Sequence, residues 1–160
     1  MNKCLLVVDV QKGFINCYTK HLPEKINKIL KYYNKIFVTK FYNEEDSLYD
    51  SLLKWKHLRK NTEEFELAFK PSKKVEIIEK NIYTCVNSSF LKKLKELNIK
   101  RIDICGIDTD ICVTKCAVDL FENGIIPVVL QEYCGSTDGY EAHENAIKTL
   151  NRFIGVNQVL

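Results

Sequence analysis

Three polar side chains, Asp9, Lys80 and Cys112, each come shortly after a short apolar run of this sequence. A thiol needs a base or a positive field to become a nucleophile at neutral pH, and a carboxylate beside a lysine supplies a base whose charge is balanced. If the three side chains meet, Asp9 would take the proton of the thiol and later return it to a leaving group. Lys80 would balance the charge of Asp9 and help lower the pKa of Cys112. The chemistry indicated is nucleophilic catalysis.

The local sequence around Cys112 favours this interpretation. Gly106 interrupts an apolar run, Thr109 and Asp110 supply helix-start chemistry, and Cys112 falls in the first turn of an expected helix. The first amides of a helix are unpaired and carry partial positive charge, which stabilises a thiolate. Backbone amides in the turn before Cys112 would also suit a developing oxyanion.

Each of these residues also has a simpler structural explanation. An aspartate at the end of a strand is usually a turn or cap residue, a lysine is usually exposed, and a cysteine is usually a small core residue. The catalytic hypothesis therefore depends on the elements that would bring the three side chains together.

The alternation of apolar runs with helical patterns predicts those elements. We expect strands at Cys4–Val8, Lys35–Phe41, Val75–Glu79, Arg101–Gly106 and Ile125–Gln131, with a closing segment over 153–160 that has room for an edge strand. We expect helices at Pro23–Tyr33, from a cap at Thr84 or Asn87 to Leu97, at Asp110–Asn123 and at Glu141–Leu150. The fold predicted is a single domain over residues 1–160, a three-layer α/β/α Rossmann-like fold with a mainly parallel sheet. In such a sheet the strand ends that precede the three candidates lie along one edge.

Composition excludes several other classes of protein. The formal net charge is +3, with lysines and arginines spread along the chain, so a nucleic-acid or membrane-surface role has little support. No run approaches the roughly 18 apolar residues of a membrane span, and no signal-peptide pattern is found at the start. The seven cysteines are scattered and odd in number, as expected of reduced thiols. We expect a cytoplasmic protein.

Three sequence blocks resemble signatures of a known family. They are VVDVQKGF at 7–14, EKNIYT at 79–84 and CGIDTDICV at 105–113. In this order they are similar to the blocks of the isochorismatase-like cysteine hydrolases, which include nicotinamidases and N-carbamoylsarcosine amidases. The resemblance implies that Asp9 is the acid and base, Lys80 its partner and Cys112 the nucleophile. It also implies a cis peptide bond between Ile107 and Asp108, with the amides of Asp108 and Cys112 as the oxyanion hole.

The resemblance implies a small-molecule amide substrate. Isochorismatases proper cleave a vinyl ether without a cysteine, so a retained thiol favours attack on an amide carbonyl, a thioester intermediate and release of ammonia or an amine. Phe14 and Tyr83, beside the catalytic residues, are candidate pocket walls or ordinary core aromatics. Two alternatives stay open: a vinyl ether hydrolase of the same fold, and a non-catalytic thiol redox or binding protein that uses Cys112 and Cys116. In the main interpretation Cys116 is a packing residue.

The chain departs from the family in two places. Nicotinamidases usually carry a D-x-H-x-x-H metal site after the second strand, whereas the stretch here, FYNEEDSLYDSLLKW, has no histidine before His57. We therefore expect no metal and no other cofactor. Asp108 stands where many members have a small residue. Pointing inward it would oppose anionic substrates, but we expect it to be an outward turn residue.

The remaining expectations concern specificity and assembly. The segment Tyr42–Pro71 departs most from the family, and we expect a helical or irregular excursion over one sheet edge. For Trp55, His57 and Arg59 the default is a packed, partly solvated helix, with a lid or a carboxylate clamp as the alternative. His143 is expected to be a structural hydrogen-bonding residue. The resemblance suggests a homodimer or larger homo-oligomer.

Overall fold

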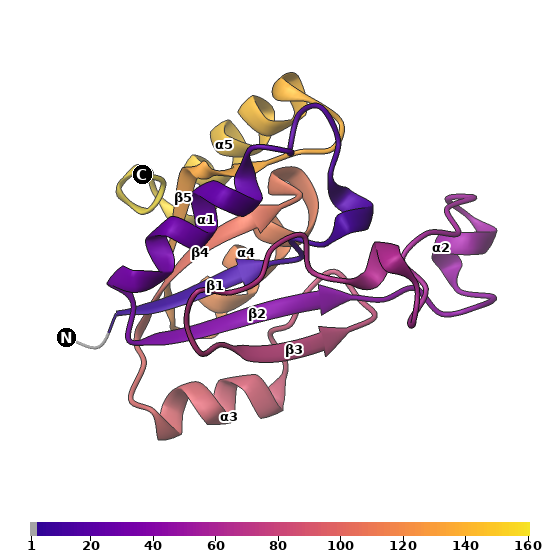
Figure 1. The fold of residues 1–160 in the computed structure, drawn as a ribbon. Helices are drawn as coiled ribbons and strands as arrows, with labels where there is room; N and C mark the ends of the chain where they lie inside the picture. The colour runs from indigo at the N-terminus through magenta and orange to yellow at the C-terminus, as the bar shows by residue number, and fades with distance from the viewer. Residues whose placement is uncertain (1–2) are drawn as a thin grey trace.

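The computed structural model describes residues 3–160, and its centre is a parallel sheet of five strands (Figure 1). The strands are β1 (Cys4–Val8), β2 (Lys35–Phe41), β3 (Glu76–Lys80), β4 (Arg101–Ile107) and β5 (Ile126–Gly135), in the spatial order β3-β2-β1-β4-β5. Every neighbouring pair is parallel. Each residue of the central strand β1 is buried, as expected of an apolar strand covered on both faces. The α/β prediction is confirmed.

Helices cover both faces of the sheet. They are α1 (Leu22–Ile29), α3 (Ser88–Glu96), α4 (Thr114–Glu122) and α5 (Tyr140–Ile154), whereas the one-turn α2 (Leu48–Ser51) lies beyond the carboxyl ends of the strands (Figure 1). Figure 1 shows α1 in front of the sheet and α4 behind it. Of the two expected caps of α3 the structure uses Asn87, whose side chain accepts a hydrogen bond from the amide of Phe90. No helix among residues 3–160 is long and apolar enough to cross a membrane.

Two strands run further than the sequence predicts. Gly106 does not end β4 but lies at a bulge within it, with a φ of 126°. The position requires glycine, because a Cβ there would lie 2.1 Å from the carbonyl oxygen of Val8. Beyond the bulge, Gly106 and Ile107 pair with Cys134 and Gly135, so β5 runs past its predicted end at Gln131. The extension brings the loop after β5 next to the turn after β4.

The expected closing strand is reduced to one bridge. Val156–Gln158 forms a turn of 3-10 helix, and Val159 then pairs with Val129 of β5 in an isolated parallel bridge. A single bridge does not make a sixth strand, so the sheet has five strands among residues 3–160.

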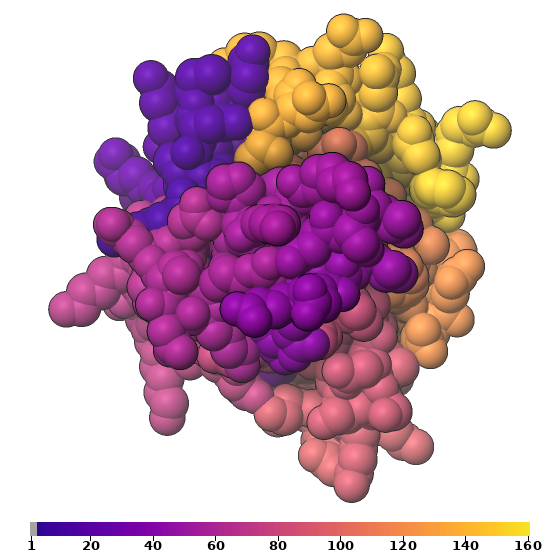
Figure 2. Space-filling model, turned by 90° about the vertical axis from the view of Figure 1, so that its right-hand side faces the viewer, coloured from indigo at the N-terminus to yellow at the C-terminus, as the bar shows by residue number. Residues whose placement is uncertain are grey.

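The segment Tyr42–Pro71 projects from the carboxyl ends of the strands (Figure 1). It contains α2 and a 3-10 turn at Glu63–Phe65 and is otherwise irregular. Figure 2 looks onto this end of the molecule, where the purple and magenta side chains of the segment cover the middle of the face. The expectation of an irregular excursion is confirmed. The helix expected to carry Trp55, His57 and Arg59 is wrong, because residues 54–60 form no helix.

Candidate active site

The structure brings Asp9, Lys80 and Cys112 together at the carboxyl ends of β1, β3 and β4. The Lys80 ammonium donates to Asp9 Oδ2 at 2.6 Å and lies 3.7 Å from Cys112 Sγ. All three side chains are buried. Lys80 Nζ also donates to the carbonyl oxygens of Ile82 and Tyr83, at 3.2 and 3.0 Å, so the chain that follows β3 fixes its position. The arrangement places a base and a cation beside a thiol.

Thr39 on the neighbouring strand β2 holds Asp9 from the other side. Its hydroxyl donates to Asp9 Oδ1 at 2.5 Å and accepts from the amide of Asp9 at 3.0 Å. Asp9 itself has a φ of 50°, a left-handed conformation that aspartate tolerates better than most residues. The carboxylate is therefore held on one oxygen by a hydroxyl and on the other by an ammonium.

Gln11 ties together the segments around Asp9. Its side-chain amide donates to the carbonyl oxygens of Phe41 and Phe65, both at 2.9 Å, and accepts from the amide of Phe41 at 2.7 Å. Because Gln11 is fully buried, losing it would leave several backbone groups without partners. It links the end of β2 to the segment that covers the site.

Burial governs the electrostatics of the thiol. Loss of solvent raises the pKa of Cys112 well above its ordinary value, and Asp9 raises it further, while Lys80 lowers it by less. Burial and Asp9 thus oppose the thiolate that the helix start is expected to favour. For Lys80, burial alone would lower the pKa, but the carboxylate of Asp9 and the neighbouring thiols raise it, so the ammonium stays charged.

The turn between β4 and α4 carries Cys112. The peptide bond between Ile107 and Asp108 is cis, which confirms that expectation. Thr109–Val113 then forms one turn of π-helix before α4, and the amides of Ile111 and Val113 both donate to the carbonyl oxygen of Asp108. Such turns occur often at functional sites. The turn places Cys112 with its side chain at the head of α4 and only 6% exposed.

Side chains fasten this turn to the loop after β5 and to α5. His143 Nδ1 lies 2.8 Å from the hydroxyl of Thr109, which gives His143 the structural role expected. The hydroxyl of Ser136 donates to Asp110 at 2.5 Å. The extended β5 makes both contacts possible.

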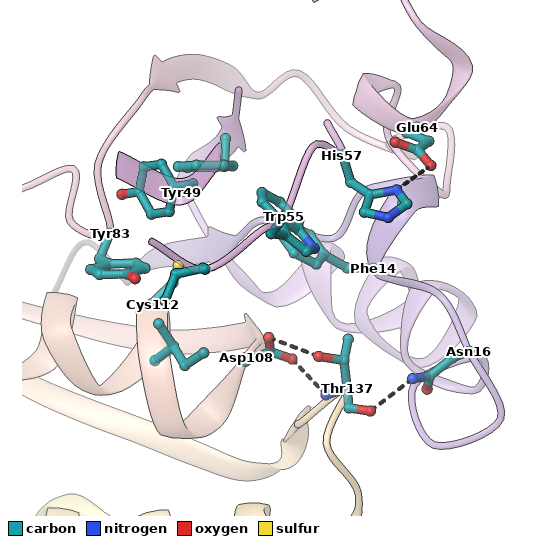
Figure 3. A pocket seen from close by; sticks show the side chains of 14 residues that line it. Phe14, Asn16, Tyr49, Trp55, His57, Glu64, Tyr83, Asp108, Cys112 and Thr137 are labelled. Atoms are coloured by element: carbon teal, nitrogen blue, oxygen red, sulfur yellow. Dashed lines mark hydrogen bonds and ion pairs between the residues drawn. The ribbon is translucent and has the colours of Figure 1, made fainter. Parts of the chain in front are cut away.

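Asp108 is bound inside the molecule. Its carboxylate accepts hydrogen bonds from the amide and hydroxyl of Thr137, at 2.6 and 3.0 Å, and the residue is buried (Figure 3). The expectation of an outward turn residue is therefore wrong. Burial raises the pKa of Asp108 to about 6, against the lowering effect of the bonds from Thr137.

A cavity of about 490 Å³ opens above Cys112. Phe14 and Tyr83, the two residues expected to line a pocket, do line it, and the irregular segment adds Tyr49, Trp55 and His57. Figure 3 shows Tyr49 and Tyr83 on one side of the space above Cys112, with Trp55 and Phe14 on the other. These aromatic walls come from three separate parts of the chain.

The side chains near the cavity do not fit a metal ion of the nicotinamidase type. His57 Nδ1 lies 3.0 Å from Glu64 Oε1, and Asp50 of the acidic stretch is bound by Arg59 and Asn43. Within residues 3–160 no three His, Cys, Asp or Glu side chains come together as a metal site would require. From the stretch after β2, the side chains of Tyr49, Leu53 and Trp55 line the cavity.

Several residues of the site could not be assigned from the sequence pattern. Thr39 gave one weak signal, a polar residue near the end of the apolar strand KIFVTKF. Tyr49 gave none, because it lies in a segment without periodicity. Arg59, considered as a clamp with Trp55 and His57, instead pairs with Asp50 and does not line the cavity.

Comparisons with known proteins agree with this architecture. The family model described as the isochorismatase domain matches residues 3–158. The nicotinamidase of Bacillus subtilis superposes with a TM-score of 0.84 at 24% identity, covering 99% of both chains. An isochorismatase-like hydrolase of Alkaliphilus metalliredigens gives 0.85 at 18% identity, covering 99% of this chain and 94% of that one.

A third similar structure is the pyrazinamidase of Pyrococcus horikoshii in complex with zinc. Its TM-score is 0.84 at 21% identity, with 99% of this chain and 97% of that chain covered. A comparison with curated protein sequences finds no match. At these identities the structural neighbours establish the fold.

Proposed function

Because the chain belongs to the isochorismatase family of hydrolases, we propose that it cleaves the C–N bond of a small amide, with Cys112 as the nucleophile. One observation carries the proposal. The Lys80 ammonium lies 2.6 Å from the Asp9 carboxylate and 3.7 Å from the Cys112 sulfur, beneath a cavity that Cys112 lines. This is the arrangement that nucleophilic attack by a buried thiol needs.

Acylation requires one proton to move twice. Asp9 accepts the thiol proton as Cys112 Sγ bonds to the carbonyl carbon, and the amides of Asp108 and Cys112 stabilise the resulting oxyanion. Asp9 then passes the proton to the amide nitrogen, the C–N bond breaks, and ammonia or an amine leaves a thioester on Cys112. Because burial and Asp9 raise the pKa of Cys112, proton transfer to Asp9 would accompany the attack.

In deacylation Asp9 again acts first as a base and then as an acid, with water as the nucleophile and the Cys112 sulfur as the leaving group. Asp9 takes a proton from a water molecule, whose oxygen bonds to the thioester carbon. The C–S bond breaks, the proton returns to the Cys112 sulfur, and a carboxylic acid leaves. Lys80 stays charged throughout and balances Asp9, with two backbone carbonyls holding it in place.

The proposal is tested by ammonia release from a panel of small amides. Cys112→Ala should reduce release to background, and Asp9→Asn should slow it by roughly 10²- to 10⁴-fold, the range for a lost general acid-base group. Circular dichroism and urea unfolding show whether each variant is folded. A folded Cys112→Ala protein that keeps full ammonia release would overturn the assignment of Cys112 as the nucleophile, whereas no ammonia release by the wild-type protein from any amide would favour the vinyl ether alternative.

We further propose that the reaction needs no metal ion. The donor groups near the cavity are already paired with one another, as His57 is with Glu64. Dialysis against a chelator should therefore leave ammonia release unchanged, and added Zn²⁺ should not increase it. A loss of activity that Zn²⁺ restores would contradict this part of the proposal.

We also propose a homodimer or larger assembly working in the cytoplasm. Free thiols at all seven cysteines suit a reducing compartment. Large apolar side chains exposed on α2 and beside it are candidates for a surface between copies.

A further inference from the structure

The walls of the cavity are aromatic on opposite sides. The rings of Phe14 and Trp55 are stacked, with an interplanar angle of 11° and centroids 6.1 Å apart, and Trp55 also contacts Phe41. Across the space above Cys112, Tyr49 and Tyr83 meet edge to face at 5.4 Å. The Phe14–Trp55 pair is too close to admit a third ring between its members, so a ligand would lie against the pair. These walls favour a flat substrate.

The charged side chains that line the cavity are mainly acidic. They are Asp108 near Cys112 and Glu64 at the far end, where it is bound to His57 (Figure 3). With His57 neutral the lining carries two negative charges, and with His57 protonated it carries one. No lysine or arginine is among the lining residues of the described chain, and the charge of Lys80 is balanced by Asp9.

The hydrogen bonds of these acids keep them in place. The carboxylate of Glu64 also accepts from the amide of Leu58 at 2.9 Å, and this bond, with the contact to His57, lowers the pKa of Glu64. Asp108 is held by the amide and hydroxyl of Thr137. Both acids therefore present fixed negative charge to a ligand above pH 7.

We infer that the cavity selects its amide substrate by charge: a substrate ring that bears a negative charge is disfavoured, and a positively charged ring is preferred. The inference rests on the proposed amidase function and adds its substrate class. A positive ring gains from the aromatic faces and from the two carboxylates, whereas a carboxylate on the ring meets no cation to pair with. The same argument disfavours substrates that carry carboxylates of their own.

Three amides of nearly the same shape test the inference. They are 3-carbamoyl-1-methylpyridinium, benzamide and 3-carbamoylbenzoate, which carry a positive, zero and negative ring charge. At pH 8 we expect kcat/KM for ammonia release to fall in that order, with the anion at least tenfold below benzamide. Equal or better turnover of the anion would overturn the inference.

A matched pair of variants assigns the effect to the cavity. Glu64→Gln should narrow the ratio of cation to anion turnover severalfold. Glu63→Gln removes the same charge one residue away, from a side chain that is 83% exposed and outside the cavity. If both variants change the ratio alike, the discrimination is a long-range effect of net charge and the assignment to Glu64 is wrong.

Binding separates this inference from the amidase proposal. Trp55 is the single tryptophan of the chain and lies in the cavity wall, so its fluorescence in the Cys112→Ala protein reports occupancy. The pyridinium should quench it, and the two other amides should compete with the pyridinium in the order stated. Binding in this order without ammonia release from the wild-type protein would refute the amidase and keep the substrate class. Ammonia release without the charge order would support the amidase and refute the substrate class. Absence of binding by all three amides would overturn the inference.

Discussion

At the scale of residues, the site depends on how a buried carboxylate is held. Asp9 is fully buried and has a hydroxyl on one oxygen and an ammonium on the other. Removing one partner of a buried charge costs far more than the net value of the interaction, because the remaining charge is left without compensation. Thr39 therefore matters to the site although it does not touch the cavity.

Replacing Thr39 by valine should weaken both folding and catalysis. The variant removes the donor to Asp9 Oδ1 and the acceptor of the Asp9 amide, and we expect a loss of roughly 1.5–3 kcal/mol in the free energy of unfolding. Ammonia release should fall with it, since the base is no longer fixed. Urea unfolding and kcat measure the two effects. Thr39→Ser keeps the hydroxyl and should retain most of both, and an equally damaged serine variant would show that packing, not the hydroxyl, is what matters.

Asp108 should make stability depend on pH in the unusual direction for a carboxyl group. Its pKa is about 6 in the folded protein against 3.8 ordinarily, so as pH rises from 4 to 6 the unfolded chain gives up this proton first and the fold loses stability. At 1.36 kcal/mol per pKa unit the loss is about 3 kcal/mol, complete above the folded pKa.

The Asp108→Asn variant lacks this titration. Relative to wild type, its free energy of unfolding should therefore improve by about 3 kcal/mol between pH 3 and pH 8. Asp138→Asn, an exposed carboxyl of the next loop, serves as the control and should follow wild type. A constant difference between Asp108→Asn and wild type across this range would contradict the raised pKa.

At the scale of elements, the strands and helices could largely be predicted because their apolar periodicity is strong. The errors lie where tertiary pairing overrides local pattern. Gly106 is a bulge and not an end, and β5 extends through Cys134 because β4 on the far side of that bulge offers it a partner. The local sequence of β4 or of β5 does not show that these residues pair with each other. The convergence of Asp9, Lys80 and Cys112 at one edge could be predicted from parallel strands, but the contacts among their side chains depend on the turns that follow those strands.

The irregular segment Tyr42–Pro71 could not be predicted in detail because side-chain hydrogen bonds and single buried residues shape it. Leu58 is fully buried at a φ of 60°, with its amide bound to Glu64 and its carbonyl oxygen to the amide of Asn43. A methyl group on Gly13 would lie 2.2 Å from Leu58 Cδ2. The aromatic wall thus depends on the fit of one leucine over one glycine.

A double-mutant cycle tests this fit. Gly13→Ala should cost about 1–3 kcal/mol by overpacking, and Leu58→Ala about 2–5 kcal/mol by leaving a cavity. Combined, they should cost clearly less than their sum, because the new methyl enters the space that the leucine leaves. Urea unfolding measures the three values, and KM reports the displacement of Trp55. Strict additivity would mean that the two positions do not share this space.

At the scale of the whole molecule, one end carries both the chemistry and an unusually apolar surface. The carboxyl ends of the strands hold the catalytic candidates, and the irregular segment covers the same face (Figure 2). Within that segment Leu48 and Leu52 are each 71% exposed, and Leu53, which is 59% exposed, also lines the cavity. Exposed leucines so close together are costly in a monomer, and their position connects assembly with access to the site.

If a second copy covers this surface, then replacing Leu48 and Leu52 by glutamine should produce a monomer of 18.6 kDa, where the wild-type protein is a dimer or larger. Light scattering after size-exclusion chromatography measures the mass. Val156→Gln, at a comparably exposed position near the C-terminus and away from α2 in the sequence, should leave the assembly intact. Because α2 leads directly into the cavity wall at Leu53 and Trp55, dissociation should also raise KM more than it lowers kcat. A wild-type monomer at all concentrations would refute the assembly, and an oligomer unaffected by the double variant would place the contact on another face.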